Sequence, residues 1–149
     1  MSLKEKIYRI YEQMLLEKIQ LLQSTLQDLS QSVANETKSS AGDKHETALA
    51  MIQIEQENKR KQLKELQLQQ VQFKKIDPTY VANQILNGAL VCTDKGYFFI
   101  SIALGKIVLE EKTIYALSPT SPLGQKLLGL RPGEEAAVNS ASYRILSVE

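Results

Sequence analysis

Apolar residues recur at three- and four-residue steps along the first quarter of the chain. The series consists of Tyr8, Tyr11, Leu15, Ile19, Leu22, Leu26, Leu29 and Val33. This spacing keeps the side chains on one face of a helix, as the seam of a coiled coil requires. A second series keeps one phase through Leu49, Ile52, Leu63, Leu66 and Phe73. Gln56 and Lys59 occupy seam positions within this second series. We therefore expect two paired helices, with weaker pairing in the half that is farther from residues 78–149.

A single glycine separates the two series. Residues 1–77 contain no proline and only Gly42, so this glycine marks the natural place for the chain to fold back. The dipeptide Asp77-Pro78 ends the second helix, because a residue before proline is pushed out of the α region. We therefore predict an antiparallel coiled-coil hairpin over residues 1–77, with its tip near residues 42–46.

Two carboxylates directly follow this glycine. Asp43 and Glu46 are three residues apart, so they project from the same face of a helix start. Carboxylate oxygens at such a spacing are suited to holding Mg²⁺. The same pair also fits a capping box, with Asp43 as N-cap and Glu46 at N3. The two interpretations are compatible, and the sequence predicts an acidic tip in either case.

The remainder of the chain, residues 78–149, holds all four prolines and six of the seven glycines. Short β-rich runs separated by turn residues cover 89–93, 97–103, 106–109, 113–117 and 142–148. Ser121 and Pro122 are typical of a helix start, and Gly129 would close that short helix after Leu128. Residues 131–134 form a turn pattern. We predict an α+β chain with a small, bent sheet and one short helix in its second part.

Charge and composition exclude several function classes. The net charge of +1 is close to neutral, so nothing calls for a nucleic-acid backbone or an anionic membrane as partner. One cysteine, Cys92, allows neither an intrachain disulfide nor a cysteine-based zinc cage, and suits a reducing compartment. No apolar stretch approaches the roughly 18 residues that span a bilayer, and the N-terminus lacks a signal-peptide pattern. We expect a cytoplasmic protein without membrane contact or sequence-specific DNA binding.

The stretch from Ser121 to Glu134 carries a recognisable motif. Its sequence, Ser-Pro-Leu-Gly-Gln-Lys-Leu-Leu-Gly-Leu-Arg-Pro-Gly-Glu, resembles the C-terminal domain of bacterial Gre-type transcript cleavage factors. That family shows Ser-Pro-aliphatic-Gly, two variable residues, two aliphatics and Gly, followed by a Gly-acidic turn. Residues 143–148 look like the family's final strand, and Gly42-Asp43-x-x-Glu46-x-Ala48 matches its hairpin-tip pattern. Two separate motifs in the right order, one in each predicted part, make the resemblance specific.

The resemblance implies an architecture, a partner and a mechanism. The second part would resemble the FKBP fold and dock on the rim of the secondary channel of RNA polymerase, with Ser121, Pro122 and Leu123 gripping the rim. The hairpin would reach the polymerase active site. There Asp43 and Glu46 would help to hold a second Mg²⁺ and a water, so that the polymerase cleaves its own backtracked transcript. The chain would be a monomer and no enzyme by itself. It would hold no metal stably when free and would meet the 3′ end of the nascent RNA only indirectly.

Alternatives remain open on particular residues. Lys44 and Thr47 depart from the family's tip pattern, which favours a channel binder without cleavage activity, acting as an inhibitory or competing regulator. An alternative from another functional class is an adaptor protein that dimerises through its coiled coil. A set of basic residues is open to two interpretations. They would face the extruded RNA, whose phosphates attract cationic side chains, or form a solvated charged surface. The set consists of Lys59, Arg60, Lys61 and Lys64.

Overall fold

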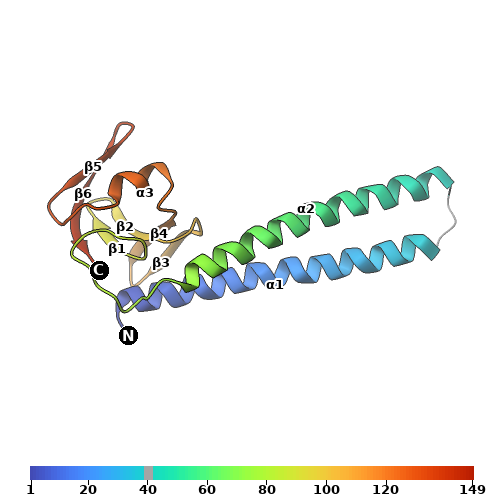
Figure 1. Ribbon diagram of the computed structural model, residues 1–149, viewed down its shortest axis with the longest axis horizontal. Coiled ribbons are helices and arrows are strands. Elements are labelled where there is room, and N and C mark those ends of the chain that lie inside the picture. Colours follow the sequence, from blue (N-terminus) through green and yellow to red (C-terminus); the bar gives the residue numbers. More distant parts are fainter. Residues whose placement is uncertain (39–41) are drawn as a thin grey trace. The chain divides into compact units, whose positions relative to one another are not determined.

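Two long helices open the chain. The computed structural model describes the backbone of residues 1–38 and 42–149 and the side chains of residues 1–36 and 46–149. Helix α1 (Leu3–Lys38) and helix α2 (Gly42–Lys74) are joined through residues 39–41 and form a hairpin (Figure 1). The Ser2 Oγ accepts the Glu5 N–H at 3.2 Å at the start of α1, the interaction expected of an N-cap. The predicted helical hairpin is therefore confirmed.

The chain divides into two compact units. The hairpin unit comprises Gln13–Val71, and the sheet unit comprises Met1–Glu12 together with Gln72–Glu149. The sequence places a division at residue 77/78 instead. The units differ from this because the first three turns of α1 and the last residues of α2 pack with the sheet.

Among the described side chains, the apolar seam residues of the hairpin unit are fully buried only near one end. Leu15 and Ile19 are fully or nearly fully buried, at 0% and 5% exposure. The next seam residues are half-buried: Leu22, Leu26, Leu29 and Val33. On α2, Gln56 is buried and Lys59 is half-buried. The two polar residues therefore occupy the seam, as predicted, and they displace apolar packing there.

A mixed six-stranded sheet forms the rest of the chain. Its strands are β1 (Leu90–Thr93), β2 (Gly96–Ile100), β3 (Gly105–Leu109), β4 (Lys112–Leu117), β5 (Glu135–Val138) and β6 (Ala141–Val148). Their order across the sheet is β3-β4-β2-β1-β6-β5. The β2–β4 pair is parallel and the other pairs are antiparallel. Together with the two helices, the sheet confirms the α+β class.

Both faces of this sheet are covered, and two adjacent residues mark the two sides. Phe99 contacts the Tyr11 and Phe73 rings, each with its centroid 6.2 Å away, so the ends of the long helices cover its side. Phe98 belongs to a second cluster on the other side with Ile85 and Leu127. Successive strand residues point to opposite faces, which is why neighbouring phenylalanines serve two separate cores.

Strand β5 was not among the elements predicted from sequence. Residues 135–138 follow the turn at 131–134 and pair with β6 across the short link at Asn139, whose φ is 56°. Asparagine tolerates this left-handed conformation better than most residues. The remaining strands lie where the β-rich runs predict them, although β2 ends at Ile100 rather than at residue 103.

Candidate functional site

The acidic pair lies where α1 passes into α2. Helix α2 begins at Gly42, so Asp43 belongs to its first turn and Glu46 lies one turn further along. Glu46 is exposed. The side chain of Asp43, and with it the predicted capping box, lies outside the described residues. The spacing of three residues on a helix places both positions on one face.

Two carboxylates would supply only part of a metal site. Mg²⁺ prefers six oxygen ligands in octahedral geometry. Among the described residues, no group of three or more His, Cys, Asp or Glu side chains lies close enough to hold a metal ion. Two carboxylates alone would leave most of these six positions to other ligands.

The four basic residues of α2 do not form one surface. Lys59 is half-buried on the seam side, with its Nζ 3.5 Å from the Glu55 carboxylate. Lys61, in contrast, is exposed and lies 3.6 Å from Glu57. Arg60 and Lys64 are exposed as well and are four residues apart, so they are neighbours on the helix surface. An exposed arc therefore contains Arg60, Lys61 and Lys64, and Lys59 lies apart from it.

A dense set of hydrogen bonds shapes the loop before α3 (Pro122–Leu127). The Ser121 Oγ accepts the Gly124 N–H at 3.1 Å and donates to the Ser118 carbonyl at 2.6 Å. The predicted N-cap at Ser121 is thus confirmed. A Cβ on Gly124 would lie 2.1 Å from the Ser118 carbonyl oxygen, so only glycine fits this close approach.

The three residues of this loop that were predicted to contact a partner differ in what they offer. The hydroxyl of Ser121 is engaged within the loop. Leu123 is half-buried and packs against the core cluster around Ile85 and Leu127. Pro122 is exposed. Pro122 is therefore the exposed residue of the three, and the other two hold the loop in position.

A buried lysine in the sheet unit was missed by the sequence analysis. Lys4 is 4% exposed, and its Nζ donates to the Tyr80 carbonyl at 2.6 Å. Burial lowers the pKa of Lys4, and the nearby Glu149 and Asp77 carboxylates partly oppose that effect. The sequence does contain a signal for this burial. Lys4 precedes Tyr8 by four residues and so falls on the same, buried face of α1.

Asp77 is held next to this lysine by a local turn. Its Oδ1 accepts the Thr79 hydroxyl at 2.6 Å and the Thr79 N–H at 2.9 Å. These two hydrogen bonds, the hydroxyl first, keep the pKa of Asp77 below its ordinary value. The side chain is consequently a fixed carboxylate at neutral pH.

No helix of the described residues is both long and apolar enough to cross a membrane.

No protein-family model matches the chain, and no curated protein matches it either. Three solved structures are similar over most of their length. The crystal structure of GreA factor homolog 1 (Gfh1) of Thermus thermophilus is 15% identical, with 93% of this chain and 94% of that chain covered and a TM-score of 0.37.

Two further structures give similar values. A structure of the transcription factor Gfh1 is 15% identical, with 92% of both chains covered and a TM-score of 0.37. Thermus aquaticus Gfh1 is 12% identical, with 91% and 92% covered and a TM-score of 0.31. At these identities and TM-scores, the matches do not place the chain in a family.

Proposed function

We propose that the chain is a Gre-like transcription elongation regulator that binds RNA polymerase and inserts its helical hairpin into the secondary channel. There it stimulates cleavage of backtracked transcripts. The observation that carries the proposal is the position of Asp43 and Glu46, in the first turns of α2 directly after the link between two long helices. The Ser-Pro-Leu-Gly motif of the sheet unit gives independent support.

In this proposal the chain contributes ligands and the polymerase contributes the reaction. Cleavage of a phosphodiester by two metal ions needs a second Mg²⁺ and a positioned water. Asp43 and Glu46 supply carboxylate oxygens to that ion and to the water, and the polymerase holds the remaining ligands. The chain is therefore a stimulator of an existing activity rather than an enzyme. It binds as a monomer and holds no metal when free.

The docking role falls to the sheet unit. Pro122 is exposed on a loop whose shape is fixed by Ser121 and by the close packing of Gly124. A rigid loop loses little conformational entropy when it binds. Ser121, Pro122 and Leu123 together are therefore proposed as the segment that contacts the rim of the channel. Arg60, Lys61 and Lys64 face the RNA 3′ segment, where cationic side chains contact phosphates.

The test is cleavage by stalled, backtracked elongation complexes at saturating protein. The wild-type chain is expected to accelerate release of short 3′ RNA fragments. Asp43→Asn and Glu46→Gln are each expected to lower that rate about tenfold or more, the effect of losing roughly 1.4 kcal/mol in the transition state. Glu65→Gln is the matched control, because it neutralises an exposed carboxylate of the same helix far from the turn. Unchanged cleavage at saturating binding would contradict the proposal.

A second candidate is a channel binder that does not stimulate cleavage. Lys44 and Thr47 motivate it, because they replace residues of the family's tip pattern. This candidate predicts polymerase binding that competes with a cleavage factor, with an inhibitory effect that Glu46→Gln leaves unchanged. A competition assay with an active cleavage factor separates the two candidates.

The adaptor candidate makes a different prediction. It requires a dimer formed through the hairpin, so sedimentation at micromolar concentration decides it. A monomer removes its main support.

A further inference from the structure

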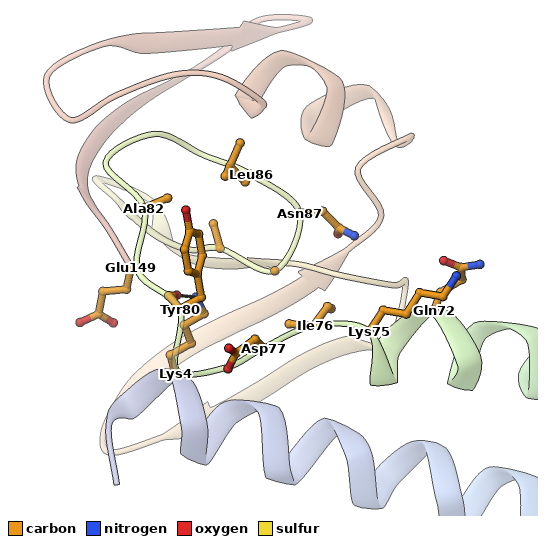
Figure 2. A pocket seen from close by; sticks show the side chains of 12 residues that line it. Lys4, Gln72, Lys75, Ile76, Asp77, Tyr80, Ala82, Leu86, Asn87 and Glu149 are labelled. Carbon is orange, nitrogen blue, oxygen red and sulfur yellow. Dashed lines mark hydrogen bonds between the residues drawn. The ribbon is translucent and has the colours of Figure 1, made fainter.

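A cavity of about 320 Å³ lies entirely within the sheet unit. Its wall is formed by Lys4 near the start of α1, by the end of α2 and the residues after it, and by Glu149 after β6 (Figure 2). This volume is at the lower end of the range for small-molecule sites, about 300–1,000 Å³. The cavity lies in a different unit from the proposed acidic tip, and nothing in the proposed function uses it.

The Lys4 side chain gives the cavity an unusual polar group. An ammonium has three protons to donate, and Lys4 donates one of them to the Tyr80 carbonyl. No carboxylate among the described residues forms an ion pair with Lys4, although Asp77 and Glu149 lie close enough to act on it through their charge. A buried ammonium is costly unless its remaining protons find acceptors. A ligand with anionic oxygens would supply them.

The two carboxylates add the opposite charge at the same place. Asp77 is exposed and fixed by Thr79, and a carboxylate accepts about four hydrogen bonds in total. The backbone of Glu149 is held by reciprocal hydrogen bonds of 2.9 Å with Leu90, and its side chain is exposed. The wall therefore carries one buried ammonium, with the fixed Asp77 carboxylate and the exposed Glu149 carboxylate near it. A group with a carboxylate and an ammonium on neighbouring atoms complements that arrangement.

The rest of the wall is partly apolar. Ile76 is 9% exposed, Ala89 is 4% exposed, and Leu86 is 38% exposed. All three line the cavity, and Figure 2 shows Leu86 and Ile76 on opposite sides of it. Burying an aliphatic group against them is favourable, because apolar surface leaves water. A ligand with a short hydrocarbon side chain therefore matches this part of the wall.

We propose that the cavity binds a free α-amino acid with an aliphatic side chain. The ligand carboxylate accepts from Lys4, the ligand ammonium donates to Asp77 and Glu149, and the side chain packs against Ile76 and Leu86. Because the ligand binds the folded chain and not the unfolded chain, it stabilises the sheet unit. At high ligand concentration this stabilisation grows with the logarithm of the concentration.

The test uses the full chain and L-leucine, followed by isothermal titration calorimetry and by thermal unfolding at increasing ligand concentration. L-Leucine is expected to bind with one site and to raise the unfolding temperature. N-Acetyl-L-leucine lacks the ammonium and L-leucinamide lacks the carboxylate, so both are expected to bind at least about tenfold more weakly, as expected for a lost hydrogen bond to a charged group. Equal binding of the three compounds would overturn the proposal.

Variants locate the site. Lys4→Met keeps an unbranched side chain as far as the Cε position and removes the charged Nζ, and is expected to abolish L-leucine binding. Lys106→Met, on the exposed edge of the sheet, is the matched control and should bind as the wild type does. Asp77→Asn is the second variant, because it retains acceptors for Thr79 and weakens ammonium binding even if Lys4→Met does not fold. Wild-type protein that shows no heat and no stabilisation at millimolar L-leucine holds only water in the cavity, and the proposal is then wrong.

Discussion

The two units of this chain bury their apolar residues to very different extents. Within the hairpin unit, the described side chains that are buried are Leu15, Ile19 and Gln56. In the sheet unit, both faces of the sheet carry residues such as Phe99 and Ile100 at 0% exposure. A helix in a two-helix hairpin has one neighbour and so buries one stripe, whereas a strand with both faces covered can bury successive residues, as β2 does from Phe98 to Ile100. The hairpin unit therefore depends on one narrow apolar seam, whereas the sheet unit has apolar cores on both faces of its sheet.

The largest effect that would test this comparison comes from Phe99→Ala. Phe99 is fully buried and contacts Tyr11 and Phe73, so its removal is expected to destabilise the sheet unit by about 3–5 kcal/mol. Leu26→Ala, at a half-buried seam position of the hairpin unit, should cost clearly less. Because two units need not unfold together, amide hydrogen exchange resolved by residue is the measurement. Equal losses at both positions would remove the contrast between the units.

A smaller effect is expected from Tyr11→Phe. The Tyr11 hydroxyl is within hydrogen-bond distance of two strand carbonyls, Gly105 at 2.8 Å and Ile114 at 3.2 Å. Removing the donor leaves a buried carbonyl without its partner, at a cost of about 1–2 kcal/mol. Urea unfolding followed by near-ultraviolet circular dichroism of the sheet unit measures the loss. Tyr115→Phe, at a more exposed tyrosine, is the control and should change the free energy of unfolding by less.

The same hydroxyl gives a pH dependence with a defined sign. Burial raises the pKa of Tyr11 to about 12, whereas an unfolded tyrosine titrates near 10. The unfolded chain therefore loses this proton first, and stability falls as the pH rises from about 10 to about 12. Tyr11→Phe should show a shallower loss across that window. An identical pH profile for the wild type and the variant would contradict the assignment.

The smallest effect sharpens the comparison from the hairpin side. Gln56 is a buried polar residue at a seam position, so Gln56→Leu is expected to stabilise the hairpin unit by roughly 1 kcal/mol through apolar burial. Gln67→Leu makes the same change at an exposed position of α2 and should have little effect. Hydrogen exchange of α2 amides reads the difference. A destabilising Gln56→Leu would mean that the seam needs the amide.

The sequence predicts the hairpin well because its signals are local. Helical periodicity, the lone Gly42 and the absence of proline are all readable within a few turns, and α1 and α2 begin and end close to the expected residues. The N-cap at Ser121 is local as well. Five of the strands follow from β-rich runs for the same reason. The predicted weakness at Gln56 and Lys59 also follows from phase alone.

What the sequence did not reveal depends on distant contacts. The seam pattern continues through Tyr8, Tyr11 and Phe73, although these residues pack with the sheet. The pattern on α1 stays the same where its packing partner changes from α2 to the sheet. Strand β5 is only four residues long, with two alanines at its centre, and its pairing with β6 defines it. The burial of Lys4 depends on Tyr80, 76 residues away. Such pairings lie beyond what periodicity encodes.

The contribution of the first twelve residues to the sheet unit has a consequence for engineering and for biosynthesis. A graft of residues 78–149 onto another chain would leave the Phe99 side of the sheet bare, because its cover comes from the two helix ends. A portable version has to carry Met1–Glu12 and residues 72–77 as well. During synthesis, the Tyr11 ring reaches its contact with Phe99 only after strand β2 has been made.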